Sequence, residues 1–108
     1  MNKQITFRGM QHSPVMEQHI NQQLAKIERF LENETEPIYL HVVLDAERTH
    51  HHHNIEIGLK TPHYDLHVRK RGPEFYKVLD ESIDALYLAL QEKKRELIDK
   101  YHTGRKKE

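Results

Sequence analysis

The sequence predicts an α+β domain, a two-layer sandwich in which a four-stranded sheet carries both helices on one face, in the order β-α-β-β-β-α. Two long segments have apolar residues at helical spacing, and four short segments alternate apolar and polar residues as strands do. A chain of 108 residues is long enough for one core and too short for several domains. We therefore expect one domain over residues 1–102 and a short basic tail over residues 103–108.

The first part of the chain predicts one strand and one helix. Residues 4–9 alternate apolar Ile5 and Phe7 with polar neighbours, which is typical of a half-buried strand. Ser13 and Pro14 form a favourable helix start, because serine caps the first turn and proline fits the first helical position. The helix should end near Glu32, and its apolar stripe consists of Met16, Ile20, Leu24, Ile27 and Leu31.

Three strands follow a polar loop that ends at Pro37. Residues 38–45, 55–59 and 64–69 each alternate with a period of two, and the short connections between them make these strands antiparallel neighbours. The first strand can join this sheet only by a crossover. We expect the sheet face opposite the helices to meet solvent or a partner; it includes Thr6, Arg8, His41, Val43, Glu56, Lys60, His67 and Arg69.

A long second helix is predicted after Gly72 and Pro73, with its end near His102. At ~1.5 Å per residue such a helix is roughly 40 Å long, which is more than a four-stranded sheet needs as cover. Its last turns should therefore overhang. Its apolar stripe consists of Phe75, Leu79, Ile83 (or Ser82), Leu86, Leu90 and Leu97.

Enzyme, cofactor and membrane functions find no support in the composition. The chain has no Cys, its 4 Gly are far apart, and neither Ser13 nor Ser82 has the setting of a nucleophile, so we expect no catalysis, cofactor or small-molecule substrate. No long apolar run or signal peptide is present, which favours a soluble, cytoplasmic protein without a membrane partner.

The run His50–His53 is the most conspicuous local pattern. Neutral imidazoles bind zinc, copper and nickel, but consecutive residues of a strand point to opposite faces, and no Cys can serve as a further ligand. A solvated hairpin connection is the interpretation we adopt, and we expect no metal site.

The net charge of zero conceals clustered basic residues. Residues 72–92 carry one basic and five acidic side chains, whereas residues 93–108 carry seven basic and three acidic ones. Such clusters can bind nucleic-acid phosphates, although they also serve solubility and the helix dipole. The candidates for RNA contact are Lys26, Arg29, Arg69, Lys70, Arg71, Lys93, Lys94, Arg95 and Lys100.

The order of elements and several local motifs resemble the ribosome hibernation promoting factor and ribosome-associated inhibitor (factor Y) family. The residues that carry the resemblance are Leu24–Arg29 in the first helix, His53–Leu59 in the third strand, and Glu74–Asp80 with Ile83, Asp84 and Leu86 in the second helix. The resemblance spans residues 3 to about 98. Their order and spacing are more specific than any single motif.

The resemblance implies a non-enzymatic factor that binds the small ribosomal subunit and its rRNA in the channel for messenger and transfer RNA. Such a factor keeps ribosomes idle in stationary phase and under stress. Lys26, Arg29 and Lys94 match basic positions of the family, and Tyr76 matches a family tyrosine, which adds it to the candidates. The chain resembles a short form, and its short basic tail favours the forms that promote ribosome pairing over those that prevent it.

Two departures from the family pattern support an alternative function. Tyr87-Leu88-Ala89 stands where the family has basic residues, and overall neutrality is unusual for a protein that lies against RNA. The alternative is a protein-interaction module that kept the fold and lost strong rRNA binding. It includes a weak homodimer formed through Tyr87 and Leu88, which the sequence places in an exposed apolar pair.

Overall fold

The structure, a computed structural model, describes the backbone of residues 1–47 and 51–106 and the side chains of these ranges up to Lys100. The elements follow the predicted order: β1 (Asn2–Arg8), α1 (Pro14–Phe30), β2 (Tyr39–Glu47), β3 (His52–Lys60), β4 (Asp65–Gly72) and α2 (Phe75–Lys106). The hairpin tip and His50 lie outside the described residues. Neither helix, over its described residues, has an apolar stretch long enough to cross a membrane.

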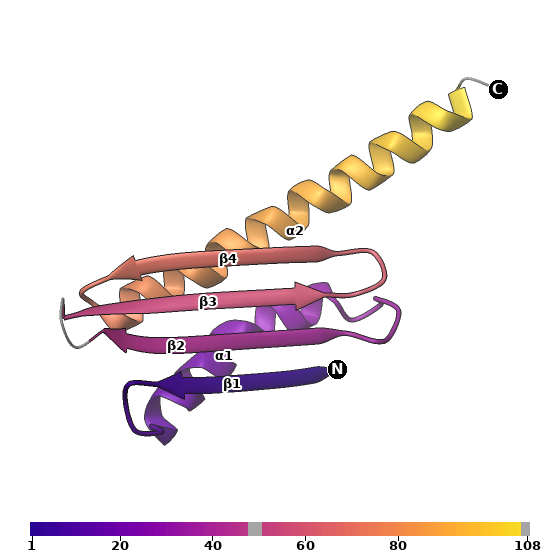
Figure 1. Ribbon diagram of the computed structural model, residues 1–108. Helices are drawn as coiled ribbons and strands as arrows, with labels where there is room; N and C mark the ends of the chain where they lie inside the picture. Colours follow the sequence, from indigo (N-terminus) through magenta and orange to yellow (C-terminus); the bar gives the residue numbers. More distant parts are fainter. Residues whose placement is uncertain (48–50, 107–108) are drawn as a thin grey trace.

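The four strands form one mixed sheet in the order β1-β2-β3-β4. β1 pairs parallel to β2 through the crossover helix α1, and β2, β3 and β4 form an antiparallel meander. Both helices lie on the same side of the sheet, α1 behind β1 and β2 and α2 behind β3 and β4 (Figure 1). The predicted α+β sandwich of two layers is therefore confirmed.

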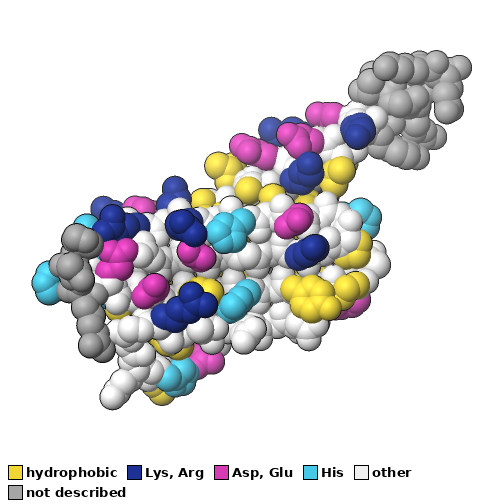
Figure 2. Space-filling model, in the orientation of Figure 1, with side chains coloured by type: hydrophobic (Ala, Val, Ile, Leu, Met, Phe, Trp, Pro, Cys, Tyr) yellow, Lys and Arg dark blue, Asp and Glu magenta, His cyan; other side chains and the backbone are white. Residues whose placement is uncertain are grey.

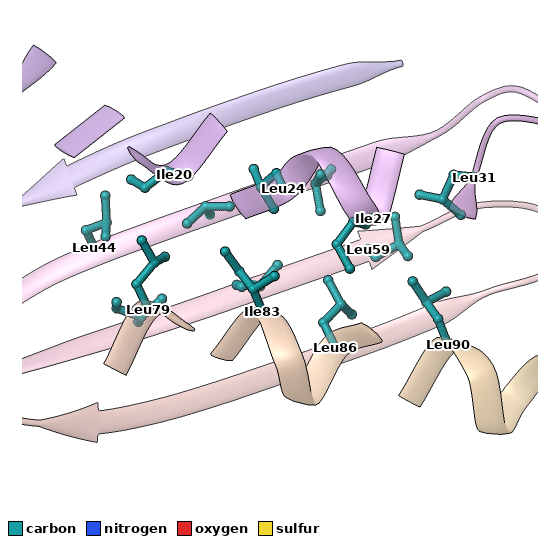
Figure 3. Close-up of a cluster of buried hydrophobic side chains, with 14 of the residues drawn as sticks. Ile20, Leu24, Ile27, Leu31, Leu44, Leu59, Leu79, Ile83, Leu86 and Leu90 are labelled. Carbon is teal, nitrogen blue, oxygen red and sulfur yellow. The ribbon is translucent and has the colours of Figure 1, made fainter. Parts of the chain in front are cut away.

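The core lies between the sheet and the two helices. Each strand contributes alternate residues, so that Leu40, Val42 and Leu44 of β2 are at most 1% exposed. In Figure 3 the side chains of α1 and α2 point toward one another above the strands. The helix-layer residues buried here are Ile20, Leu24 and Ile27 of α1, its C-cap Leu31, and Phe75, Val78, Leu79, Ile83, Leu86 and Leu90 of α2.

The start of α1 confirms the predicted cap. Ser13 has an extended backbone, and its Oγ accepts a hydrogen bond from the Met16 N–H, while Pro14 occupies the first helical position. The turn before it depends on Gly9, whose φ is +66° and where a Cβ would lie 2.7 Å from the Ala46 carbonyl oxygen. Glycine is required there for both reasons.

The end of α2 differs from the sequence prediction. The helix continues to Lys106, and Leu97, which we placed on the apolar stripe, is 37% exposed. Leu90 is the last buried residue of α2 among those whose side chains are described. The spacing predicted the helical face correctly, but the sheet ends before Leu97, so that residue has no layer to pack against (Figure 1).

A nearly buried carboxylate connects two loops at one end of the sandwich. Glu34, in the connection between α1 and β2, accepts hydrogen bonds from the Thr61 hydroxyl and, at 3.0 Å, from the Thr35 N–H. His63 Nδ1 lies 2.8 Å from the same carboxylate, whose side chain is 9% exposed. Thr61 in turn accepts the N–H of Tyr64 at 2.9 Å. The carboxylate thereby holds the turn between β3 and β4.

The hydrogen bonds to Glu34 lower the pKa of its carboxyl group. Burial on its own raises the pKa of this carboxyl, but the hydrogen bonds from Thr61, His63 and Thr35 together outweigh burial. The pKa of Glu34 therefore lies below its ordinary value of 4.5. Because the folded pKa is the lower one, the ionised form stabilises the fold above pH 4.5, and this contribution is lost as the pH falls through the folded pKa.

We expect Glu34→Gln to lower the free energy of unfolding by about 1–3 kcal/mol at pH 7, because the amide cannot replace every charge-assisted hydrogen bond of the carboxylate. Urea unfolding at pH 7 and at intervals down to pH 3 measures this. The difference between wild type and variant should shrink toward the acid end. Glu32→Gln, an exposed residue of the same connection, is the matched control. A constant difference across the pH range would contradict the assignment.

Candidate nucleic-acid interface

The outer surface of the helix layer contains a seam where side chains of α1 meet side chains of α2. His19 Nε2 lies 3.3 Å from the Asp80 carboxylate, and the His19 ring packs edge-to-face on Tyr76 with centroids 4.8 Å apart. Seven residues further along α1, Lys26 forms an ion pair with Asp84, which lies one turn after Asp80 on α2. The seam therefore contains both Lys26 and Tyr76, two of the residues that the sequence proposes for RNA contact, at separate points along it.

Aromatic rings continue the seam toward the end of α1. The Lys26 ammonium lies 5.3 Å from the centroid of the Tyr87 ring, which itself packs edge-to-face on Phe30 at 5.9 Å. Lys94 Nζ lies 5.3 Å from the centroid of the Phe30 ring. Tyr87 is thus partly buried against the core, and the expected exposed pair of Tyr87 and Leu88 is wrong, because only Leu88 is exposed, at 56%.

The part of α2 beyond Leu90 carries the remaining helical candidates. Lys94, Arg95 and Lys100 are exposed, and Lys93 forms an i,i+3 ion pair with Glu96 at 3.5 Å. Arg29 is exposed in the last turn of α1, next to Phe30, which Lys94 contacts. The structure therefore places Lys94 beside Phe30 at the end of α1, next to Arg29 in sequence, and carries Arg95 and Lys100 on the overhang.

The basic run of β4 is divided between the two faces of the sheet. Arg69 and Arg71 point to the open face, where each donates to a carboxylate at 2.8 Å, Arg69 to Glu56 and Arg71 to Glu47. Lys70 has the opposite orientation because strand residues alternate. Figure 2 shows the consequence on the open face, where basic and acidic side chains lie next to one another among histidines. The run is not one basic patch.

Sequence reasoning missed the carboxylates that neutralise the candidates. Of the ten candidate residues, four have ion pairs in the structure: Lys26, Arg69, Arg71 and Lys93. The pair of Arg69 with Glu56 follows from the hairpin register. Lys60 pairs with Asp65 across the turn, so Glu56, four residues before Lys60, pairs with Arg69, four residues after Asp65. The pair of Lys26 with Asp84 joins positions 58 residues apart, and no local pattern indicates it.

Within the part of the chain that the structure describes, the other candidate cations have no carboxylate at ion-pair distance. These residues are Arg29, Lys70, Lys94, Arg95 and Lys100. Three of them lie on α2 after Leu90, on a segment that projects from the sandwich (Figure 1). This overhang carries three exposed cations without a described ion pair, interspersed with the acidic residues Glu92, Glu96 and Asp99.

The histidine run does not converge on one point. His52 and His53 belong to β3 and not to the connection as expected, and the ring of His53 packs edge-to-face on Phe75 with centroids 5.6 Å apart. His52 lies on the opposite face because of the strand alternation. Among the described residues, no three histidine, aspartate, glutamate or cysteine side chains are arranged to hold a metal ion. His50 lies outside that range.

Two solved structures have a similar fold. The N-terminal domain of Protein Y from Thermus thermophilus matches with a TM-score of 0.71 and 18% identity, covering 85% of this chain and 98% of that one. A ribosomal subunit interface protein from Coxiella burnetii matches with a TM-score of 0.74 and 18% identity, covering 88% of this chain and 99% of that one. At such identities the likeness shows a shared fold. No curated protein sequence matches the chain significantly.

The family assignment comes from the sequence. The model of the family described as sigma 54 modulation protein / S30EA ribosomal protein matches residues 3–98. This range begins in β1, includes both helices of the sandwich and ends within the overhang of α2. It coincides with the range over which the sequence resembles the factor Y family, and the resemblance is confirmed. The chain belongs to the sigma 54 modulation protein / S30EA ribosomal protein family.

Proposed function

We propose that this chain is a ribosome hibernation factor, which binds the small ribosomal subunit in the channel for messenger and transfer RNA and thereby silences translation. The observation that carries the proposal is the family match over residues 3–98. The structural neighbours, a ribosomal subunit interface protein and a Protein Y domain, support the same partner. The cytoplasm is the compartment that this function requires.

The proposed mechanism is steric and requires no cofactor or catalytic step. A sandwich with an apolar core and one long helix is a rigid object, 58 × 25 × 17 Å along its principal axes. Such a body bound in the channel excludes the RNA that would otherwise occupy it. Affinity then depends on phosphate contacts, which fix position without reading the base sequence.

The unpaired cations favour α2 as the main contact. Lys94, Arg95 and Lys100 can neutralise phosphates without first leaving a carboxylate of the chain, whereas Arg69 and Arg71 of β4 are already paired. Counterion release then makes binding weaken as salt is added. We propose the remaining candidates, Arg29, Lys70, Lys93 and Tyr76, as peripheral contacts.

The test is sucrose-gradient co-sedimentation with separated bacterial ribosomal subunits at low and at moderate salt. We expect the wild type to migrate with the small subunit and to dissociate as salt rises. Replacement of Lys94, Arg95 and Lys100 together by Gln should weaken binding. It should also reduce the steepness of the slope of log K against log salt by about two to three. Circular dichroism should show an unchanged fold, since no side chain described beyond Leu90 is buried.

The matched control replaces Arg69, Lys70 and Arg71 together by Gln, which changes the net charge by the same amount. We expect a smaller loss of affinity, because Glu56 and Glu47 already neutralise two of these three residues. A larger loss for the β4 variant would move the contact surface to the sheet. Wild-type protein that stays at the top of the gradient even at low salt would contradict the proposed function.

A protein-interaction module is the second candidate. It is favoured by the neutral net charge and by the four ion-paired candidates, which reduce the charge available for RNA. Leu88, at 56% exposure, is the residue left for a weak homodimer once Tyr87 is packed on Phe30. Sedimentation equilibrium that shows only monomer at high concentration would remove the dimer.

A further inference from the structure

The α1–α2 seam places carboxylates where an RNA-binding helix face needs positive charge. Asp80 and Asp84 lie one turn apart on α2, and each contacts a basic side chain of α1: Asp80 contacts His19, and Asp84 contacts Lys26. These pairs hold the two helices together across their outer edge. The Lys26 pair also uses a positive charge that α1 would otherwise offer to a phosphate.

Lys26 is enclosed more completely than the other candidates. The Asp84 carboxylate binds its ammonium group, the Tyr87 ring lies 5.3 Å away, and the Lys26 side chain is 37% exposed. Asp84 is more exposed, at 69%. A phosphate that approaches Lys26 from solvent therefore meets the negative charge of Asp84 at the same place.

Lys94 is the natural comparison, because it also lies on a ring of the seam. Its ammonium lies 5.3 Å from the centroid of Phe30, and no described carboxylate is within ion-pair distance of it. A ring orients the ammonium but leaves its full charge, whereas a carboxylate cancels that charge at long range. Lys26 therefore lies beside a negative charge and Lys94 does not, although both lie along the seam between α1 and α2.

We propose that Asp84 is a built-in competitor for phosphate, which keeps Lys26 from binding RNA and confines the contact surface to the distal part of α2. The proposal rests on the proposed function and adds to it a residue that sets affinity from within the protein. Ribosome binding is then weaker and less dependent on salt than the number of basic residues implies. Lys26 matches a basic position of the family pattern, but its ammonium group is paired with Asp84.

The experiment measures binding of wild type and Asp84→Asn to separated small ribosomal subunits over a range of salt. We expect the variant to bind about three- to thirtyfold more tightly at low salt, because a negative charge beside the phosphate is removed and Lys26 is released. The salt dependence should become steeper by about 0.7 to 0.9, the value for one additional phosphate contact. The pair is exposed, so the variant should fold as the wild type does, which thermal melting checks.

Two controls separate release of Lys26 from a change in net charge. Glu81→Gln makes the same charge change on an exposed position of α2 that has no described ion pair, and it should alter affinity much less. In a Lys26→Gln background, Asp84→Asn should lose its steeper salt dependence, because the released lysine is absent. Equal gains for Asp84→Asn and Glu81→Gln would overturn the proposal.

Failure of the inference and failure of the proposed function give different results. If the wild type binds subunits and Asp84→Asn binds no better than Glu81→Gln, Asp84 is not a competitor and the ribosomal function stands. If Asp84→Asn binds where the wild type does not, the competitor is confirmed and the proposed function of the wild type is overturned. If no variant binds at low salt, both proposals are overturned.

Discussion

The structure depends on a single layer of contacts between one face of the sheet and two amphipathic helices. Both helices have one apolar stripe, and each strand has one apolar face, so every apolar surface can be buried only if both helices share the same side of the sheet. Buried side chains of α1 and α2 meet over the strands, with Leu24 and Ile83 fully enclosed. Polar side chains occupy the described surfaces outside this layer.

This packing determines where charge can be used. With the helices on one side, the opposite face of the sheet is left to polar residues, and the strand register sets basic residues beside acidic ones, as Arg69 is set beside Glu56. The helices, packed side by side, bring Lys26 to Asp84 in the same way. Four of the ten candidate residues are neutralised in such pairs, whereas Lys94, Arg95 and Lys100, on the part of α2 that projects beyond the sandwich, have no described ion pair.

The overhang of α2 has a simple cause and a functional consequence. The helix is longer than the sheet, so the residues after Leu90 have no layer beneath them. An apolar residue such as Leu97 is left partly exposed there, and of the described basic side chains only Lys93 has an ion pair, with Glu96. A projecting basic helix can enter a narrow site lined by RNA more readily than a flat sheet face can.

The helices and strands could be predicted from the sequence alone, because periodicity and capping are local properties. The stripe of α1, the Ser13 cap and the three alternating strands could all be read from neighbours along the chain. The pair of Arg69 with Glu56 was within reach of the same reasoning, since a short turn defines the register of a hairpin.

Which candidate cations are available to bind a phosphate depends on the tertiary structure. The contacts of Lys26 with Asp84 and of Lys94 with Phe30 join positions on separate helices, and they depend on how two helices lie side by side. Tyr87 is partly buried because it packs on Phe30 of α1, and Leu97 is exposed because the sheet does not reach it. Spacing along a helix shows which face a side chain occupies. What that face contacts depends on packing between elements that are remote in the sequence.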